Sequence, residues 1–285
     1  MLGDSLFVKN KMSYQELGPK FALAIDKGHN IVPDEVSFLK RAGFDFLVWE
    51  NGNLHVVVEN DNFLRSTTLN NGEDIPNRLD EGVADFGIFG RDVLIEAQLT
   101  GIEVEEVVRL NMSHCRVVVE VPIYSSYSKP KDLDGMRIAT RFPNHAREYF
   151  SDYDAEIRTV KYSGGEEAAV AQGAADAVMA IYRSGTTMGE NGLRLIGGII
   201  TKDTPKDEVK RILTRSTIIE SQALLVASTE FLNEHGSDRI VRQFINRVRQ
   251  TAGTRAVRRV VRLETVMPVP EFILVDDPPQ IPQIA

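Results

Sequence analysis

Apolar segments of strand length alternate with amphipathic segments along most of the chain, a pattern that predicts strands connected by helices. Residues 21–25 form a continuous apolar run, and a short glycine-containing loop follows it. Residues 32–43 then repeat apolar positions at helical spacing, with Pro33 permitted in the first turn and Gly43 ending the helix. A strand, a short loop and a helix in this order begin an α/β unit.

The first half of the chain continues with a predicted hairpin, a helix and a strand. Residues 46–58 carry alternating apolar positions around an Asn-Gly pair at 51–52, which is a strong hairpin signal. Residues 74–76 (Asp-Ile-Pro) begin a helix that ends at Gly82. Residues 83–89 then have the pattern of a strand that enters a loop holding glycine and arginine.

The second half repeats this alternation. Residues 115–122 are strongly β-prone and form the predicted crossover into a second lobe. Residues 201–211 are polar and predict a loop or hairpin tip, and residues 217–227 predict one long strand or a strand after a bend. The remaining predicted elements are strands at 136–140, 155–162, 177–181 and 193–200, and helices at 143–150, 166–172 and 229–261.

The two halves share a short stretch of similar sequence. Residues 82–85 (Gly-Val-Ala-Asp) and 173–176 (Gly-Ala-Ala-Asp) each follow a predicted helix and precede an apolar strand. Two similar lobes, each with a loop at the carboxyl end of a strand, would face each other across a cleft, because ligands of open α/β sheets bind at that end. The stretch is short, so a coincidence between common α/β sequences is the alternative explanation.

These elements predict an α/β fold of two lobes followed by a tail. The first lobe comprises residues 1–112 and about 214–262, and the second lobe comprises residues 113–213. Residues 263–285 hold five prolines and no helical period, which predicts an extended tail. Residues 1–20 are weakly patterned and predict a surface extension or a contact with a partner chain.

Composition narrows the class of protein. A chain of 285 residues with 42% hydrophobic and 26% charged residues is typical of a soluble globular protein. The net charge of −8 argues against a nucleic-acid-binding surface, and no apolar run is long enough to span a membrane. The first twenty residues lack the pattern of a signal peptide, and the single cysteine, Cys115, excludes an internal disulfide. We therefore expect a cytoplasmic protein.

Candidate chemistry lies directly after the strand at 177–181. The loop Arg183-Ser184-Gly185-Thr186-Thr187 offers three hydroxyls, several backbone N–H groups and one guanidinium. Glycine permits close approach of the backbone to a ligand, successive N–H groups form a concave anion site, and arginine binds phosphate in a bidentate manner. The loop therefore predicts a phosphate site. The alternative is an ordinary turn, since Ser, Gly and Thr are common in turns.

Other candidate groups are weaker. Lys27, in the loop after the first strand, is placed to reach an anion, although most such lysines are only solvated. The five histidines are scattered, and no pair of them has the spacing of a metal site. We expect no metal ion bound directly by the protein.

Five stretches between residues 21 and 227 resemble, in order, the motifs of one enzyme family. Residues 24–28 resemble the family's strand with a lysine-glycine loop. Residues 74–92 resemble its Asp-Ile-Pro helix and the following run, which in the family reads Ala-Asp-Leu-Gly-Ile-Thr-Gly-Lys-Asp. Residues 115–122 resemble the family's Cys-Arg-Leu-Val-Val-Ala-Val-Pro, residues 137–144 its Arg-Ile-Ala-Thr-Lys-Tyr-Pro-Asn, and residues 176–193 its phosphoribosyl-diphosphate loop. The chain thereby resembles ATP phosphoribosyltransferase, which opens histidine biosynthesis.

The resemblance implies a fold and a reaction. The fold is a two-lobe, type II periplasmic-binding-protein-like architecture with the site in the inter-lobe cleft. In the reaction, N1 of ATP attacks the anomeric carbon of phosphoribosyl diphosphate, and pyrophosphate carrying Mg²⁺ leaves. Such a site needs positioning and charge stabilisation more than a strong base.

The resemblance also implies roles for particular residues. The loop from Ser184 through Gly185, Thr186 and Thr187 to Met188 would hold the 5-phosphate, with Arg183 beside it. Three cations, Lys27, Arg91 and Arg116, would face the pyrophosphate or the phosphates of ATP. Asp176 would contact the ribose or, through water, the magnesium ion, and Glu167 would line the same pocket.

The chain departs from the family pattern at several of these positions. Where the family motif reads Asp-Ala-Ile-Val-Asp, residues 176–180 end in Ala180, and acidic residues at this kind of position hold ribose hydroxyls. Asp26 replaces a proline, and His29 and Asn71 replace arginines. These departures favour an alternative, a catalytically weakened paralogue that acts as a regulatory or ligand-sensing subunit. A third hypothesis is a two-lobe protein that binds another small anion.

The resemblance finally bears on assembly. About 58 residues follow residue 227, with too few strand signals for the regulatory domain of long family members. The chain is therefore similar to short forms, which work with a histidyl-tRNA-synthetase-like regulatory subunit. A homo-oligomer is also expected from the family.

Overall fold

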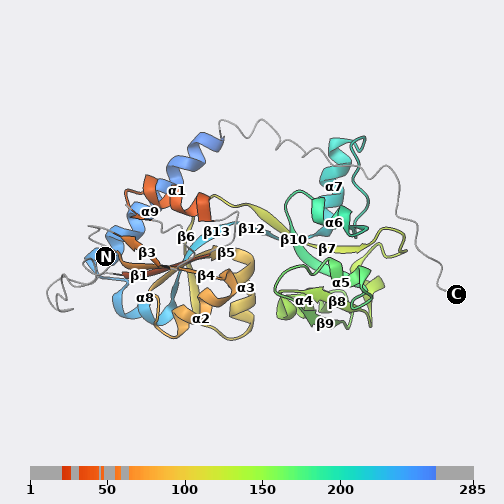
Figure 1. Ribbon diagram of the computed structural model, residues 1–285, viewed down its shortest axis with the longest axis horizontal. Helices are drawn as coiled ribbons and strands as arrows, with labels where there is room; N and C mark the ends of the chain where they lie inside the picture. Colours follow the sequence, from red (N-terminus) through yellow and green to blue (C-terminus); the bar gives the residue numbers. More distant parts are fainter. Residues whose placement is uncertain (1–20, 27–31, 45, 48–54, 59–63, 261–285) are drawn as a thin grey trace, which may run out of the picture. The chain divides into compact units, whose positions relative to one another are not determined.

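The computed structural model describes residues 21–26, 32–44, 46–47, 55–58 and 64–260 (Figure 1). Lys27, His29, the Asn-Gly pair at 51–52 and both terminal segments fall outside these residues. None of the described helices is both long and apolar enough to cross a membrane.

The contacts of the described residues divide the chain into two compact units. One unit holds the described residues up to Phe89 together with Glu103–Val108 and Leu225–Ala252. The other holds Gly90–Ile102, Arg109–Leu224 and the described residues from Gly253 onward. The division differs from the predicted lobe limits at residues 90–102, 109–112 and 214–224 and from residue 253 onward. Residues 91–99 and 217–221, within two of these segments, pack on or pair with elements of the second unit.

A seven-stranded sheet with the strand order β2-β3-β4-β1-β5-β13-β6 forms the centre of the first unit. β1 pairs in parallel with both β4 and β5, and β3 pairs antiparallel with β2 and with β4. The pairing of β2 with β3 confirms that these segments form the predicted antiparallel pair. The strands are β1 (Phe21–Asp26), β2 (Phe46–Leu47), β3 (His55–Val58), β4 (Leu64–Asn70), β5 (Phe86–Gly90), β6 (Val104–Arg109) and β13 (Ala223–Ser228).

Aromatic side chains attach the C-terminal helix to the rest of the first unit. The ring of Phe244 lies 4.7 Å from the ring of Phe86 and 5.6 Å from that of Phe21. The guanidinium of Arg247 lies 4.4 Å from the centroid of the Phe44 ring. The helices with these strands are α1 (Val32–Arg41), η1 (Gly72–Asp74), α2 (Ile75–Asp80), α8 (Thr229–His235) and α9 (Arg239–Val260).

The second unit contains a six-stranded sheet in which β7 pairs with β10, β11 and β12. The strand order is β11-β7-β10-β8-β9, and β12 also pairs with β7. β10 runs antiparallel to β7 and parallel to β8. The elements are α3 (Arg91–Leu99), β7 (Cys115–Pro122), η2 (Pro130–Leu133), β8 (Arg137–Thr140), α4 (Pro143–Ser151), β9 (Arg158–Lys161), α5 (Ala168–Ala171), β10 (Ala177–Tyr182), α6 (Thr186–Glu190), β11 (Leu193–Leu195), α7 (Lys206–Ser216) and β12 (Thr217–Ser221).

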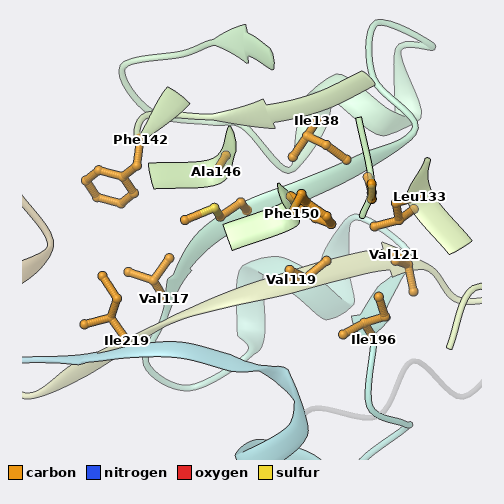
Figure 2. Close-up of a cluster of buried hydrophobic side chains, with 13 residues drawn as sticks. Val117, Val119, Val121, Leu133, Ile138, Phe142, Ala146, Phe150, Ile196 and Ile219 are labelled. Atoms are coloured by element: carbon orange, nitrogen blue, oxygen red, sulfur yellow. The ribbon is translucent and has the colours of Figure 1, made fainter. Parts of the chain in front are cut away.

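The two faces of this second sheet are covered differently. On one face Val117, Val119 and Val121 of β7 belong to the same buried cluster as Phe142 and Phe150 (Figure 2). Because successive side chains of a strand alternate between faces, the intervening residues of β7 point to the other face. Side chains of α5 and α6 pack on that face, which we call the α5/α6 face.

The prediction of a loop or hairpin tip at residues 201–211 is wrong, because α7 begins within this segment at Lys206. Only Val209, Ile212 and Ser216 of α7 are buried, and most of the other residues are charged or polar. An amphipathic helix with so narrow an apolar stripe resembles a polar loop in sequence.

The segment at 217–227 is a strand after a bend, which was one of its two predicted forms. β12 pairs with β7 in the second sheet, whereas β13 lies in the first sheet between β5 and β6. One residue, Gln222, separates the two strands. The chain therefore passes from one sheet to the other at this point.

The sequence similarity between residues 82–85 and 173–176 corresponds to a repeated structure. In each copy a helix ends at a glycine with positive φ, +67° at Gly82 and +69° at Gly173. The amide of each glycine donates to the carbonyl three residues earlier, and the next two amides share one carbonyl of the preceding helix. Positive φ is the conformation that glycine adopts at helix ends without a steric penalty.

The aspartates that follow these glycines also have equivalent contacts. The Ala22 amide donates to Asp85 Oδ2 at 2.7 Å, and the Asp85 amide donates to the Ala22 carbonyl at 2.9 Å. The Arg137 amide donates to Asp176 Oδ2 at 2.8 Å, and the Asp176 amide donates to the Arg137 carbonyl at 2.8 Å. Each aspartate thus fastens the start of its strand to the neighbouring parallel strand, so the coincidence considered above is not the explanation.

Candidate active site

The predicted phosphate loop joins the end of β10 to α6. Gly185 has φ +81° and ψ 5°, and an added Cβ there would lie 3.0 Å from Cε2 and 3.1 Å from Oη of Tyr182. The hydroxyls of Ser184 and Thr186 lie 3.0 Å apart. The backbone conformation and the contact with Tyr182 therefore both favour glycine at this position.

The side chains of this loop face different surroundings. Thr186 and Thr187 are exposed at the start of α6, whereas Met188 packs on the α5/α6 face. The Thr186 amide donates to Ser184 Oγ at 3.4 Å. Amides at the start of a helix have no acceptor within the helix, and successive N–H groups of such a turn can bind an anion. The loop thus offers polar groups to solvent and is anchored by an apolar side chain beneath it.

Arg183 lies close to the start of β7. Burial raises the pKa of the Cys115 thiol to about 11, the Asp92 carboxylate adds to the rise, and the Arg183 guanidinium opposes it by its charge and by a hydrogen bond. The Asp92 amide donates to Ser221 Oγ at 3.2 Å, and the Ser221 hydroxyl donates to Asp92 Oδ1. These contacts bring together the starts of α3 and β7, the end of β12 and the loop after β10.

Two further predicted cations belong to this end of the second sheet. Arg116 is opposite Tyr182 on β10 and opposite Glu220 on β12, with which it forms an ion pair of 3.4 Å. Arg91 begins α3, is exposed, and donates its amide to the Gln222 carbonyl at 3.1 Å. The structure therefore gathers Arg91, Arg116 and the loop of residues 183–188 at one end of one sheet. Lys27 falls outside the described residues.

Glu167 lies at the N-cap position of α5 and is half-buried. Its neighbour Glu166 is 2% exposed and accepts a hydrogen bond from Arg141 Nε at 3.0 Å. Both glutamates lie near a third carboxyl, that of Glu120 on β7, whose pKa is raised to about 8 by burial and by their negative charges. Sequence reasoning missed Glu120, and the available signal was a single glutamate within an otherwise apolar strand.

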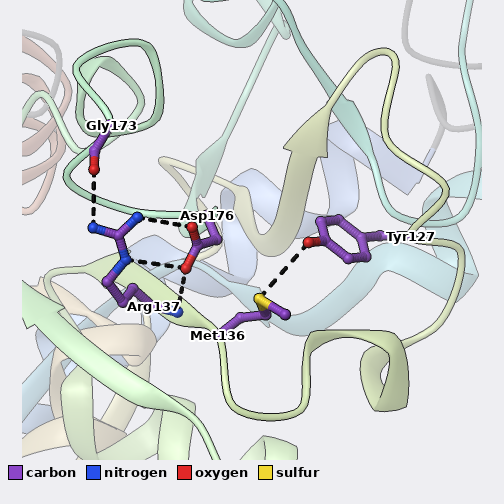
Figure 3. A network of polar contacts seen from close by, with 5 residues as sticks. All are labelled: Tyr127, Met136, Arg137, Gly173 and Asp176. Atoms are coloured by element: carbon purple, nitrogen blue, oxygen red, sulfur yellow. Dashed lines mark hydrogen bonds and ion pairs between the residues drawn. The ribbon is translucent and has the colours of Figure 1, made fainter.

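Asp176 is not brought to the loop. Arg137 donates to its two oxygens, from Nε to Oδ2 at 3.1 Å and from Nη2 to Oδ1 at 2.8 Å (Figure 3). These hydrogen bonds hold the pKa of Asp176 below its usual value. Asp176 precedes β10 whereas the loop follows it, and a strand of six residues spans about 20 Å.

The expectation that Asp176 contacts the ribose or the magnesium ion stays a prediction, and the structure places its carboxylate against Arg137, before β10. Its contacts repeat those of Asp85, which indicates a role in strand pairing. Asp176 and Arg137 border an open cavity of about 450 Å³ that also involves Ser125, Ser126 and Tyr127.

The departures from the family pattern occupy contrasting positions. Ala180 is fully buried in β10, opposite Val118 of β7 and on the α5/α6 face. Asn71 is exposed before η1, and its side-chain Nδ2 donates to Asp74 Oδ2 at 3.2 Å. Among the described residues, no group of three or more His, Cys, Asp or Glu side chains is placed to hold a metal ion.

Comparisons with known proteins identify one family. Residues 71–205 match the family model "HisG: ATP phosphoribosyltransferase". An ATP phosphoribosyltransferase of Methanopyrus kandleri is 40% identical over 127 residues, which are 45% of this chain and 44% of that protein. One of Prochlorococcus marinus (strain MIT 9312) is 34% identical over 182 residues, which are 63% of this chain and 84% of that protein. The chain therefore spans less than half of the first relative and most of the second.

Solved structures show the same fold. The ATP phosphoribosyl transferase (HisG:HisZ) complex from Thermotoga maritima gives a TM-score of 0.60 at 22% identity, over 82% of this chain and 99% of that one. The periplasmic aliphatic sulphonate binding protein SsuA from Escherichia coli gives 0.50 at 14% identity, over 86% and 77%. These likenesses confirm the predicted two-lobe α/β fold of the type II periplasmic-binding-protein kind. With a relative matched over 84% of its length at 34% identity, the chain belongs to the ATP phosphoribosyltransferase family.

Proposed function

We propose that this protein is an ATP phosphoribosyltransferase, a glycosyltransferase that transfers phosphoribosyl from phosphoribosyl diphosphate to N1 of ATP in the first step of histidine biosynthesis. The observation that carries the proposal is the loop of residues 183–188, with Gly185 in a glycine-specific conformation and arginines at the same end of the sheet. Family membership supports this reaction over other uses of the fold.

The reaction places distinct demands on the site. The bond from ribose C1 to the diphosphate oxygen breaks, and a bond from C1 to N1 of adenine forms. Positive charge develops on the ribose and negative charge on the leaving diphosphate, so fixed cations near the diphosphate lower the barrier. Arg91, Arg116 and Lys27 are the proposed cations, and Arg183 and the Ser184–Thr187 hydroxyls and amides would hold the 5-phosphate.

Magnesium would enter with the diphosphate. The described residues offer no carboxylate cluster that would hold the ion by themselves. Mg²⁺ commonly binds through substrate phosphates and keeps several waters. When bound, the ion neutralises charge on the leaving diphosphate, and the arginines supply the remaining positive charge from the protein.

The proposed assembly follows the family. The Thermotoga maritima structure is a complex with a second component, HisZ. For the present chain we propose a comparable regulatory subunit and a homo-oligomer. ATP and phosphoribosyl diphosphate are the proposed substrates, and the cytoplasm is the proposed location. Ala180, His29 and Asn71 favour the alternative in which the chain itself is a regulatory or ligand-sensing subunit.

The experiment that tests the proposal is a calorimetric titration of the purified protein with phosphoribosyl diphosphate and Mg²⁺, followed by an assay of pyrophosphate release after addition of ATP. Micromolar binding and release are expected. Binding without release, also in the presence of a HisZ-type subunit, would favour the regulatory alternative. Binding of inorganic phosphate or sulfonates but not of phosphoribosyl diphosphate would favour the third hypothesis, a small-anion binding protein.

A further inference from the structure

Glu120 is a buried carboxyl that the proposed reaction has not yet used. It lies near the end of β7, its exposed fraction is 1%, and its Oε2 atom has no hydrogen-bond partner. Burial of a polar group without a partner is unfavourable, and such groups in native proteins usually have a functional reason. We therefore expect a ligand to supply the hydrogen bond that Glu120 Oε2 lacks.

The strand register places Glu120 next to the position of the missing family carboxylate. Glu120 is opposite Val178 on β10, and Val118 is opposite Ala180. Glu120 and Ala180 are thus diagonal neighbours on the α5/α6 face, at about 7–8 Å between Cα atoms, a gap that a long side chain spans.

The two positions have exchanged their residue types relative to the family. The family strand that resembles residues 115–122 has alanine where this chain has Glu120, and the family motif that resembles residues 176–180 has an aspartate where this chain has Ala180. On this face the present chain therefore has a carboxyl on β7 and none at residue 180 of β10.

A chain of contacts connects Glu120 to the phosphate loop. The ring of Tyr182 lies against Gly185, where an added Cβ would meet it at 3.0 Å. The pKa of Tyr182 is raised by burial and by the negative charge of Glu120, so the carboxyl lies near this tyrosine. Tyr182 is therefore near both the loop and the Glu120 carboxyl.

We propose that Glu120 binds the ribose hydroxyls of the substrate whose 5-phosphate is held by the Ser184–Thr187 loop. The inference rests on the proposed function. A carboxyl accepts hydrogen bonds from adjacent hydroxyls, and a sugar supplies the partners that the protein does not. Met188 of α6 packs on the clusters on both sides of Glu120, so a sugar bound at the carboxyl would displace this side chain.

The test compares ribose 5-phosphate with its 2-deoxy and 3-deoxy analogues by calorimetry. The wild-type protein is expected to prefer ribose 5-phosphate over at least one analogue. Glu120→Ala should weaken the binding of ribose 5-phosphate about tenfold and abolish this preference, since the hydrogen bonds between the carboxyl and the ribose hydroxyls are lost. A merely structural role would lower all three affinities together. Glu148→Ala, an exposed glutamate of α4, is the matched control and should change none of them.

Two further variants make the test decisive. Glu120→Gln keeps the size of the side chain but replaces one acceptor oxygen by an NH2 donor. It cannot accept a hydroxyl on each of two oxygens, so the preference should fall even if Glu120→Ala is unstable. The double variant Glu120→Ala/Ala180→Asp returns the carboxyl to the family position and should restore the preference. An unchanged preference in folded Glu120→Gln and Glu120→Ala proteins would overturn the inference. Failure of the wild-type protein to bind any of these phosphates would instead overturn the proposed function.

Discussion

The protonation of Glu120 makes the stability of the protein depend on pH in a direction that a surface glutamate would not produce. Its pKa is raised from 4.5 to about 8 in the folded protein, chiefly by burial. Between these two pH values the folded state retains a proton that the unfolded state releases. The free energy of unfolding therefore falls as the pH rises, and this contribution is fully present below pH 4.5.

The size of the effect follows from the shift in pKa. Each pH unit between 4.5 and 8 removes about 1.4 kcal/mol, so the total loss is about 5 kcal/mol. By pH 7 about 3 kcal/mol of this stability has been lost. Glu120→Gln replaces the acid by an amide that does not ionise. We therefore expect the stability of the variant relative to the wild type to increase by about 3 kcal/mol from pH 4.5 to pH 7.

Urea unfolding followed by circular dichroism at several pH values between 4.5 and 8.5 provides the measurement. The ionisable groups that face Glu120 are Glu166, Glu167 and Tyr182. They are present in both proteins, so the difference between the two curves isolates Glu120. Wild-type and variant curves that run parallel over this range would show that Glu120 is ionised in the folded protein, and the reasoning from burial would then be wrong.

Three other substitutions test the loop and the strand contacts. Gly185→Ala should weaken the calorimetric affinity for phosphoribosyl diphosphate tenfold or more, since φ +81° costs alanine about 1–2 kcal/mol and the added Cβ meets Tyr182. Gly189→Ala is the control: a Cβ at Gly189 meets no atom within 4 Å, so this affinity should stay unchanged. Asp176→Asn should lower the free energy of unfolding by about 1–3 kcal/mol in urea but change the affinity for phosphoribosyl diphosphate less than twofold. Arg183→Ala should weaken that affinity about tenfold or more by calorimetry, through loss of a charged phosphate contact.

Hydrophobic periodicity predicted most strands because their apolar runs are bounded by turn residues. The run at 115–122 corresponds to β7 at both ends, and Gly43, Gly82 and Gly185 adopt the positive φ that their positions required. Such features depend on a few neighbouring residues, so they are readable from one sequence. The helix α7 was missed because only three of its eleven residues are buried.

The candidate site was predictable only where its chemistry is local. The loop of residues 183–188 is contiguous, and its residue types indicate anion binding without reference to the rest of the fold. The position of Glu120 depends instead on its register with β10 and on the cover supplied by α5 and α6. These contacts join residues about 60 positions apart, and a glutamate in an apolar strand is equally compatible with an exposed edge.

Asp176 shows why a motif does not by itself assign a role. It belongs to the stretch that resembles the family's substrate loop, yet its contacts are those of Asp85, which lies in the other half of the chain and precedes a different loop. Two aspartates at equivalent places in a repeated structure have a shared structural reason to be acidic, because each accepts the amide of a neighbouring parallel strand. The ribose then needs another acceptor on the face beneath the loop. Since Ala180 supplies none and Glu120 is buried there without a partner for Oε2, the carboxyl on β7 is the group that the geometry offers.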